Sequence, residues 1–310
     1  MDKKVSSIEF EKIRKIILKH DKDFYYSKVN IIPDETELVK DLKKYIKPEN
    51  FTTKAVIGID IYRYSSYEHF EQTLIPFLFK ELFQTAVNFC LENNEFVFQK
   101  NKQSDFEKSF LSTGDGGYLI LDTPIHALFF AINFELAVRL YNSYHLFPKL
   151  RKIIGEISLR YAITYDAIYY FNNNFYGRAI INNARILEKD NLNRCLIDKD
   201  TYTWFQVNTD GTENLQVITL NEIANILDFK DYDRKLIESG KNFIIAKDYS
   251  REYGIINSDI LKIGKIQSKD SSLDIYNLHL QISMKVQEKT NPGNSRVITI
   301  SLGNLNTTGI

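Results

Sequence analysis

The sequence predicts a mixed α/β protein whose main domain is an α/β sandwich of the ferredoxin-like or palm type. Short apolar runs alternate with longer helical patterns over residues 51–205, in the order β-α-β-β-α-β-β-α-β. Hydrophobic residues make up 44% of the chain and charged residues 26%, an ordinary composition for a globular protein. With 310 residues, the chain is long enough for more than one domain. We therefore expect an N-terminal helical extension (1–50), a main domain (51–205) and an accessory α+β domain (206–310).

The first half of the main domain follows a helical, charged N-terminal region. A near-continuous apolar run at 55–61 is typical of a buried central strand, and a long helix pattern follows over about 67–92. A hairpin is expected next, with strands at 106–111 and 118–121 on either side of a glycine-rich turn at 113–117.

The second half of the main domain begins at Thr123-Pro124, because proline is favoured in the first turn of a helix. The expected elements are a helix to about Tyr144, strands at 157–164 and 167–171, a turn at 172–174, a helix at 178–189 and a strand at 194–197. Apolar and polar residues then alternate from Tyr276 to Val286, which predicts a half-buried strand. A turn at 291–294 and a returning strand from Ile298 would complete the accessory domain.

The charge balance and the cysteine count narrow the choice of partner and compartment. Forty basic residues balance forty acidic ones, so no net positive field draws the chain to nucleic acid or to an anionic membrane. Two cysteines, Cys90 and Cys195, suit a reducing compartment. The N-terminus lacks the pattern of a secretion signal, and the apolar stretch 128–138 is shorter than the ~20 residues that span a bilayer. We expect a cytoplasmic protein with no nucleic-acid or membrane partner.

Asp60 and Asp115 are the acidic residues that most strongly suggest chemistry. Asp60 ends a buried strand, where a carboxylate requires an ionic partner or a cation. Asp115 lies in the turn of the expected hairpin, which could run beside that strand. Taken singly, Asp60 could be a helix N-cap and Asp115 a plain turn residue. Together, two carboxylates at adjacent strand ends suit hard divalent cations such as Mg²⁺ or Mn²⁺.

Four segments, in this order, resemble the class III nucleotidyl cyclases over about residues 53–200. Ile59–Ser65 is similar to the first metal motif of that family, and Ser112–Gly116 is similar to its second, a Gly-Asp in a hairpin. Leu159–Ile163 resembles the strand that precedes the dimer-contacting region. Tyr176–Glu188 resembles the later helix with its Gly-xxx-Asn-xxx-Arg-Leu pattern.

The resemblance implies a homodimer with two metal ions, Mg²⁺ or Mn²⁺, at each site. Asp60 and Asp115 would bind the metals together with the carbonyl of Ile61. The loop after that strand would hold phosphates, and its residues are Arg63, Tyr64 and Ser65. Arg185 would reach from the opposite subunit to stabilise charge on the transferred phosphoryl group, since its fork of donors matches phosphate oxygens. A solvated surface cation is the alternative reading of Arg185.

The chain departs from the family pattern at the helix asparagine. That position holds Ile181, while Asn182 and Asn183 follow directly. Asn182 lies three residues before Arg185 and so shares a helix face with it. Asn182 would take the role of orienting the ribose, or the alignment is shifted by one residue.

The base-reading positions also differ from those of the purine cyclases. Leu111 stands where a purine cyclase has lysine, and Asn174 stands where it has an acid or cysteine. Without that pair, adenine cannot be bound in the familiar way, and missing hydrogen-bond partners discriminate strongly between substrates. The departures point to the bacterial pyrimidine cyclases of Pycsar anti-phage systems.

For such a cyclase the resemblance implies conversion of UTP or CTP to its 3′,5′-cyclic monophosphate. The product would activate a separate effector during infection, and the accessory domain would be sensor-like. Three alternatives stay open. One is a purine cyclase that reads its base through main-chain contacts, and another is a degenerate domain that binds nucleotide without turnover. A diguanylate-cyclase-like enzyme is the third, although Gly116-Gly117 is followed by Tyr118-Leu119 and not by that family's acidic signature.

Overall fold

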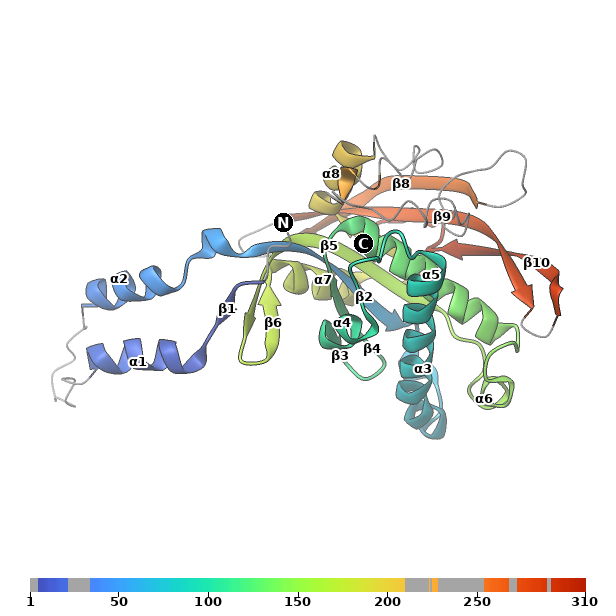
Figure 1. The fold of residues 1–310 in the computed structure, drawn as a ribbon, viewed down its shortest axis with the longest axis horizontal. Helices are drawn as coiled ribbons and strands as arrows, with labels where there is room; N and C mark the ends of the chain where they lie inside the picture. Colours follow the sequence, from blue (N-terminus) through green and yellow to red (C-terminus); the bar gives the residue numbers. More distant parts are fainter. Residues whose placement is uncertain are drawn as a thin grey trace. The chain divides into compact units, whose positions relative to one another are not determined.

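A computed structural model describes residues 5–21, 34–209, 223, 225–227, 254–267, 272–288 and 291–310. The chain forms two compact units, shown as ribbons in Figure 1. One unit comprises Met1–Thr53 and Asp166–Arg178, and the other comprises Lys54–Tyr165 and Ala179–Ile310. The boundary therefore falls three times within continuous elements, so that the strands β2 and β5 and the helix α7 each begin in one unit and end in the other.

The smaller unit joins the N-terminal segment to a hairpin from the middle of the chain. Its N-terminal elements are β1 (Ser7–Ile8), α1 (Phe10–Asp21), α2 (Thr36–Tyr45) and the 3₁₀ helix η1 (Pro48–Asn50). The hairpin consists of the end of β5 (Leu159–Phe171) and β6 (Asn174–Gly177), with Ile168 opposite Gly177. β1 pairs in parallel with this end of β5, at Ser7↔Tyr170 and Ile8↔Phe171. The N-terminal extension expected from the sequence is thus helical, and it is anchored to the β5–β6 hairpin by a short strand.

Aromatic side chains hold this unit together where the core is small. The ring of Phe51 stacks on Tyr169 at 4.7 Å, and Tyr169 stacks on Tyr176 at 5.8 Å. Between the two helices, the Asp41 carboxylate binds Lys19 at 3.0 Å and His20 at 3.1 Å. These contacts pair α1 with α2 and the segment before β2 with the hairpin.

The larger unit contains the remaining elements. They are β2 (Thr52–Ile61), η2 (Tyr64–Ser66), α3 (His69–Asn93), α4 (Gln103–Lys108), β3 (Phe110–Ser112), β4 (Gly116–Leu121), α5 (Pro124–Asn142), α6 (Pro148–Ile154), the first part of β5, α7 (Arg178–Lys189), β7 (Cys195–Asp198), α8 (Lys199–Asn208), β8 (Gly254–Gln267), β9 (Ser272–Glu288) and β10 (Asn291–Leu302). The strand order is β10-β9-β7-β5-β2-β4-β3, and β8 pairs with β9. Over β2–β7 the order matches the sequence prediction except for two additional short helices, α4 and α6, and for the strands between α6 and α7.

Several boundaries differ from the sequence prediction for local reasons. Phe106 belongs to the short helix α4, where it is buried, so β3 begins only at Phe110. The two strands expected at 157–164 and 167–171 are one continuous strand, β5, which runs through Tyr165 and Asp166. β6 replaces part of the expected turn at 172–174, where Asn172 and Asn173 adopt the left-handed conformation that asparagine tolerates.

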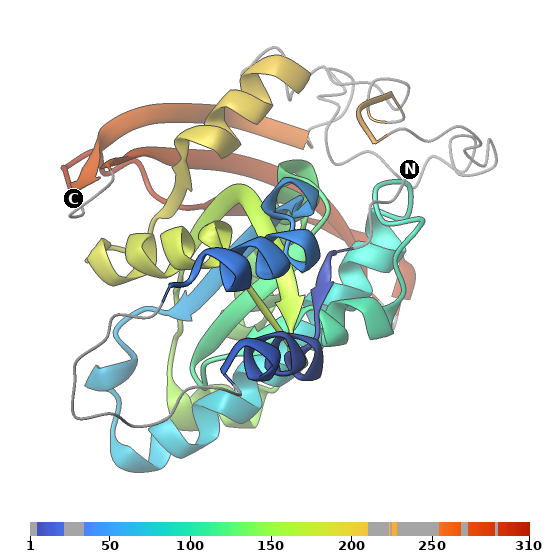
Figure 2. The same ribbon diagram turned by 90° about the vertical axis from the view of Figure 1, so that its left-hand side faces the viewer.

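The C-terminal strands continue the same sheet and do not form a separate body. β9 pairs antiparallel with β7 at Cys195↔Leu278, and β10 and β8 pair with β9. In Figure 2, α8 lies against the long C-terminal strands. The expected boundary at residue 205 thus falls inside one compact unit, because the exposed edge of β7 is completed by β9. Much of the stretch from 210 to 253 lies outside the described residues, and so do residues 289–290 within the expected returning hairpin.

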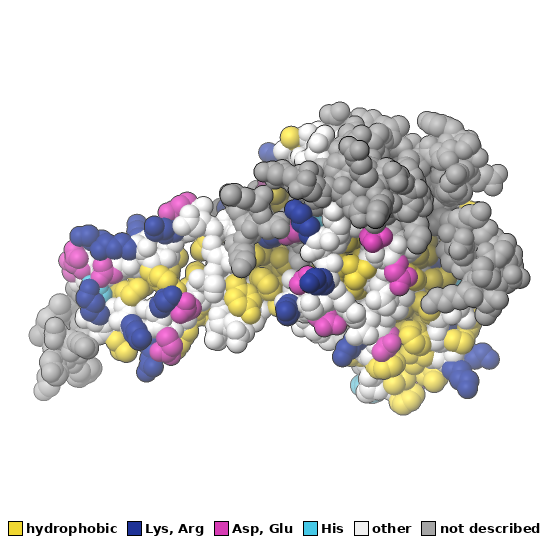
Figure 3. All heavy atoms as spheres, in the orientation of Figure 1, with side chains coloured by type: hydrophobic (Ala, Val, Ile, Leu, Met, Phe, Trp, Pro, Cys, Tyr) yellow, Lys and Arg dark blue, Asp and Glu magenta, His cyan; other side chains and the backbone are white. Residues whose placement is uncertain are grey.

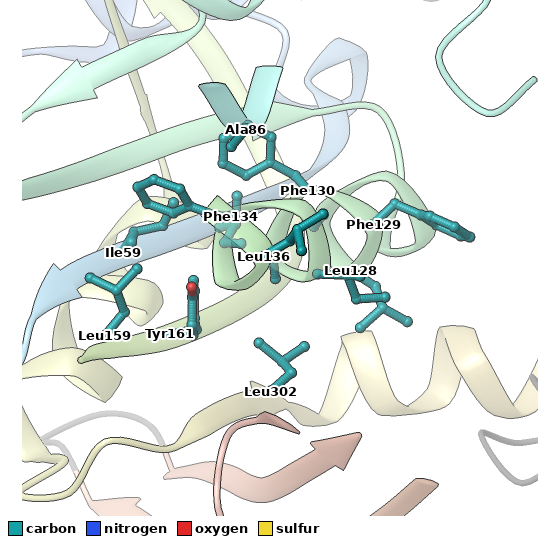
Figure 4. Packing of buried hydrophobic residues seen from close by; sticks show 14 of the residues in the cluster. Ile59, Ala86, Leu128, Phe129, Phe130, Phe134, Leu136, Leu159, Tyr161 and Leu302 are labelled. Atoms are coloured by element: carbon teal, nitrogen blue, oxygen red, sulfur yellow. The ribbon is translucent and has the colours of Figure 1, made fainter. Parts of the chain in front are cut away.

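The core lies between α5 and the sheet. α5 is buried along almost its whole length because both sides are covered, one by α3 and the other by strands. Figure 4 shows Phe134 and Leu136 of α5 beside Ile59 of β2, Tyr161 of β5 and Leu302 of β10. The strands β2 and β10, which lie far apart in the sequence, therefore share one apolar core.

α3 combines a buried face with exposed aromatic residues. By length and composition alone it is apolar enough to cross a membrane, and the same properties suit the core position of its buried residues, such as Leu78 and Leu82. Figure 3 shows hydrophobic side chains gathered on the visible surface near α3 and α6. Phe70 and Phe77 of α3 and Ile153 of α6 are exposed.

Candidate functional site

Asp60 and Asp115 are brought to one place by the pairing of β2 with β4. Asp60 lies opposite Gly116 in this antiparallel pair, and Asp115 immediately precedes Gly116 in the turn from β3. The amide of Ile61 donates to the carbonyl of Asp115 at 3.3 Å. A Cβ atom on Gly116 would meet the carbonyl oxygen of Ile59 at 2.1 Å, so glycine is required for the turn to approach β2 this closely.

The two carboxylates interact with one another. Burial raises the pKa of Asp60, the nearby Arg160 guanidinium opposes that rise, and the charge and hydrogen bonding of Asp115 add to it. Both aspartates are half-buried, and neither is turned away into solvent. The arrangement therefore concentrates negative charge at the end of β2.

Arg160 compensates part of that charge, a role that its place in the sequence did not predict. It lies on β5, the neighbour of β2 in the sheet, between the buried residues Leu159 and Tyr161. Its Nε and Nη2 atoms both lie 2.5 Å from Oδ2 of Asp60, and its Nη1 atom donates to the carbonyl of Asp190 at 2.5 Å. An arginine within a buried strand beside an expected acidic site was the signal in the sequence.

The residues at this place fit divalent metal ions. Two carboxylates on adjacent strand ends provide hard oxygen ligands, and their mutual repulsion is relieved by a cation. Ile61, the last residue of β2, is buried directly beside them. Among the described residues, no group of three or more His, Cys, Asp or Glu side chains is arranged to hold a metal. Any metal here would therefore be held by Asp60, Asp115 and main-chain oxygen, with its remaining ligands from water or substrate.

The expected phosphate loop follows β2 directly. Arg63 adopts a left-handed backbone conformation with φ of 59°, and its carbonyl accepts from the Ser66 hydroxyl at 2.7 Å. Tyr64 and Ser65 begin the short 3₁₀ helix η2. The Arg63 and Ser65 side chains are exposed, whereas Tyr64 is half-buried. This loop leaves the end of β2 next to Asp60, as the sequence prediction requires.

The two neighbouring asparagines of α7 lie in different environments. Asn183 is fully buried and its Nδ2 donates to the carbonyls of Val56 and Ala162, both at 2.8 Å. A Cβ on Gly58 would meet Oδ1 of Asn183 at 1.9 Å, so the glycine in β2 makes room for this amide. Asn183 thus joins α7 to two strands and is a structural residue.

Asn182 and Arg185 take no part in the hydrogen bonds of Asn183. Both are half-buried, and Ile181, at the family's asparagine position, is 52% exposed. Arg185 has no ion-pair partner within the described ranges of the chain. No hydrogen bond or ion pair among the described residues of this chain joins either residue to Asp60.

The two expected base-reading residues lie in different compact units. Leu111 is half-buried in β3, opposite Tyr118, in the same unit as Asp60 and Asp115. Asn174 is exposed at the start of β6, where its Oδ1 accepts from the amide of Phe175 at 2.9 Å. Asn174 belongs to the smaller unit, with the N-terminal segment.

Comparison with known proteins gives distant likenesses only. No family model and no curated protein matches the chain. A solved adenylate/guanylate cyclase/hydrolase from Silicibacter pomeroyi is 12% identical over 73% of this chain and 95% of its own, with a TM-score of 0.36. A Trypanosoma brucei adenylate cyclase is 12% identical over 75% and 89%, with a TM-score of 0.40. A guanylyl cyclase domain from Blastocladiella emersonii is 8% identical over 74% and 96%, with a TM-score of 0.39. Likenesses at these values carry no conclusion about the function of this chain.

Proposed function

We propose that this chain is a class III nucleotidyl cyclase that converts UTP or CTP to its 3′,5′-cyclic monophosphate and pyrophosphate. One observation carries the proposal: the Asp60 and Asp115 carboxylates interact at the ends of neighbouring strands. They do so within the order of strands and helices that the sequence predicts, to which α4 and α6 are added.

The residues of the chain have distinct roles in this proposal. Two divalent ions, Mg²⁺ or Mn²⁺, would supply Lewis-acid stabilisation of phosphate charge when bound to Asp60, Asp115 and the Ile61 carbonyl. Arg63, Tyr64 and Ser65 would bind the phosphates in the loop after β2. Arg160, now paired with Asp60, has a fork of donors that suits phosphate oxygens once the carboxylate turns to a cation. The site therefore keeps positive charge close to the triphosphate.

Arg185 and Asn182 would complete the site of a second copy in a homodimer. Arg185 has no ion-pair partner in the described part of its own chain, which supports a role outside it. The ribose 3′-hydroxyl attacks the α-phosphorus in line, the bond to the leaving pyrophosphate breaks, and the hydroxyl proton passes to solvent. Arg185 would stabilise the charge of the transferred group, and Asn182 would orient the ribose.

The choice of a pyrimidine rests on Leu111 and Asn174. An apolar side chain at the first position offers no hydrogen bond to a purine, and an amide at the second carries no charge. The product would act as a cytoplasmic signal to a separate effector in defence against phage, without nucleic-acid or membrane partners. A purine cyclase is the alternative on the same site.

The direct test is incubation of the purified chain with each of the four ribonucleoside triphosphates and Mn²⁺, followed by mass identification of the products. We expect cyclic UMP or cyclic CMP together with pyrophosphate. Cyclic AMP or cyclic GMP as the main product would replace the pyrimidine assignment and keep the reaction. Absence of a cyclic mononucleotide from all four substrates would overturn the cyclase proposal.

A nucleotide-binding domain without turnover is the second candidate. Two observations favour it. Ile181, at the family's asparagine position, is exposed, and Arg160 forms an ion pair with the Asp60 carboxylate. In that case a triphosphate would raise the unfolding temperature while remaining intact, which the same incubation followed by thermal unfolding would detect.

A further inference from the structure

A buried ion pair organises the loop between α7 and β7, beside the candidate site. Nε and Nη2 of Arg194 lie 2.8 Å and 2.7 Å from the same oxygen, Oδ1 of Asp190, and both side chains are almost fully buried. The amide of Leu192 donates to that oxygen at 3.2 Å. Because both charges are removed from water, the pair fixes the shape of the 190–194 loop.

One side of this loop contacts the residues of the proposed catalytic site. The carbonyl of Asp190 accepts from Nη1 of Arg160 at 2.5 Å, and Arg160 in turn binds Asp60. The carbonyl of Asn191 accepts from the Tyr62 hydroxyl at 3.2 Å, and the amide of Tyr161 donates to the Arg194 carbonyl at 2.8 Å. The loop thus touches β5 and the segment that follows β2.

The other side of the loop contacts the C-terminal segment, Gly303–Thr308. Nη1 of Arg194 donates to the carbonyl of Thr308 at 2.7 Å and lies 3.5 Å from that of Asn306. Nδ2 of Asn304 donates to the side-chain oxygen of Asn193 at 2.8 Å and to its carbonyl at 3.1 Å. The segment therefore binds the loop through both main chain and side chain.

The C-terminal segment has a defined shape of its own. The amide of Asn306 donates to Oδ1 of Asn304 at 2.9 Å, and the amide of Thr308 donates to Oδ1 of Asn306 at 3.0 Å, which makes two successive side-chain turns. Gly303 begins the segment in a left-handed conformation, and a Cβ there would meet the amide of Cys195 at 2.9 Å. The segment is thus folded against the start of β7.

We propose that Arg194 is a positioning residue through which the C-terminal segment sets the placement of Arg160 and Asp60. The segment holds the 190–194 loop, the Asp190 carbonyl in that loop holds Arg160, and Arg160 orients the Asp60 carboxylate. This inference rests on the proposed function, because it gives Asp60 the role of a metal ligand. With the Asp190 anchor in place, Arg160 stays beside the site after Asp60 turns to a cation. Without the Asp190 anchor, Arg160 has only Asp60 to bind, and it competes with the cation for that carboxylate.

The test compares a chain that ends at Gly303 with a control chain that ends at Thr308. The control loses two residues and keeps the hydrogen-bonding groups of Asn304, Asn306 and Thr308, with a terminal carboxylate in place of the Thr308 carbonyl. In the absence of metal and nucleotide, we expect the shorter chain to exchange the Tyr161 amide at least about tenfold faster, since its acceptor lies in the loop. Amides of β2 at 55–59 serve as the internal reference and should stay protected in both chains. Unchanged exchange at Tyr161 would overturn the proposal.

A second readout is the affinity for Mn²⁺ without nucleotide, measured by calorimetry in the presence and absence of Arg160→Ala. We expect the chain ending at Gly303 to bind Mn²⁺ about three- to tenfold more weakly, and this difference to vanish when Arg160 is replaced. An equal loss in both backgrounds would show that the segment acts on folding alone. Arg194→Lys, which keeps the charge beside Asp190 but cannot also span to Thr308, should weaken Mn²⁺ binding in the same direction.

The two proposals fail in distinguishable ways. A full-length chain that binds Mn²⁺ with the expected coupling but forms no cyclic product keeps the positioning role and overturns the cyclase assignment. If the full-length chain forms cyclic product but the shortened chain shows no coupling to Arg160, the cyclase assignment is kept and the positioning role is overturned.

Discussion

Two hairpins of this chain carry residues expected at one site, and they differ in what holds them. The β3–β4 hairpin is paired along β2, and a glycine with no room for a side chain brings Asp115 next to Asp60. The β5–β6 hairpin, with Asn174 at the start of β6, is paired with β1 and belongs to the smaller unit.

The difference separates the proposed site into two parts. The metal-binding part is assembled within one compact unit and depends on strand register, which a rigid sheet fixes. The ribose-orienting part depends on Asn182 and Arg185, and no hydrogen bond or ion pair among the described residues joins either of them to Asp60. We infer that the first part is preformed and that Asn182 and Arg185 complete the site of a partner copy.

The largest expected effect is at the metal-binding part. Asp60→Asn and Asp115→Asn should each reduce turnover at least about 10³-fold, because each removes a charged ligand for the ions that stabilise phosphate charge. Product formation measured by mass, with circular dichroism to verify folding, would test this. Asp166→Asn is the matched control from the other hairpin, where the carboxylate pairs with Arg178, and should cost less than about tenfold. Equal losses from all three variants would remove the distinction between the hairpins.

The next effect concerns the partner copy. Asp115→Ala and Arg185→Ala chains should each be inactive alone, but mixing them in equal amounts should restore about a quarter of the normal activity, because half of the dimers would contain one intact site of two. The measurement is product formation after mixing, with subunit exchange verified by mass. No recovery in exchanged dimers would place Arg185 outside a shared site.

A smaller effect is expected for base selection. Leu111→Lys together with Asn174→Asp would restore the lysine and acid with which purine cyclases of the resembled family read adenine. We expect the double variant to shift the ratio of turnover with ATP to turnover with UTP or CTP by about tenfold toward ATP, which corresponds to one good hydrogen bond. Each single variant is the control and should shift the ratio less. An unchanged ratio in the double variant would exclude both residues from the base pocket.

The fold of the main domain was predictable because its signals are local. The apolar run before Asp60, the proline that opens α5 and the pattern of α7 each determine an element without reference to the rest of the chain. The strand pairing of β9 with β7 was not predictable. A half-buried strand has the same alternating pattern whether it belongs to a separate domain or extends the edge of an existing sheet. The link between β1 and the β5–β6 hairpin joins residues more than 150 positions apart, and a strand of two residues carries no pattern.

The candidate site was predictable only where the residue type implied its environment. A carboxylate at the end of a buried strand has few structural uses, so Asp60 stood out. Asn183 did not, because burial of its amide depends on Gly58 of β2 leaving room for it, and that is a property of two segments together. Arg160 was visible as a charge in an apolar strand, but its partner was not, because strand order decides which carboxylate lies beside it.

The smallest expected effect concerns the core beneath the preformed part of the site. Burial raises the pKa of Glu135, on α5, to about 7, although the nearby Tyr161 hydroxyl opposes the rise. Since this folded pKa lies above the ordinary value of 4.5, the folded chain binds the extra proton, and its stability falls as pH rises from about 4.5 to 7. Glu135→Gln removes the ionisable group and should raise the free energy of unfolding at pH 8 by on the order of 1 kcal/mol, with little change at pH 4.5.

Denaturant unfolding at the two pH values, with the exposed Glu188→Gln as control, would measure this difference. Tyr161, the neighbour of Glu135 in the core, directly follows Arg160 in β5. The Glu135→Gln variant therefore also tests whether a change in core stability alters the activity of the site. Turnover and base preference should stay close to those of the unmodified chain at pH 8, because α5 supports β5 from the side opposite α7. A large change in base preference would mean that the core position of β5 adjusts the site, and the metal-binding part would then be less rigid than the sheet pairing implies.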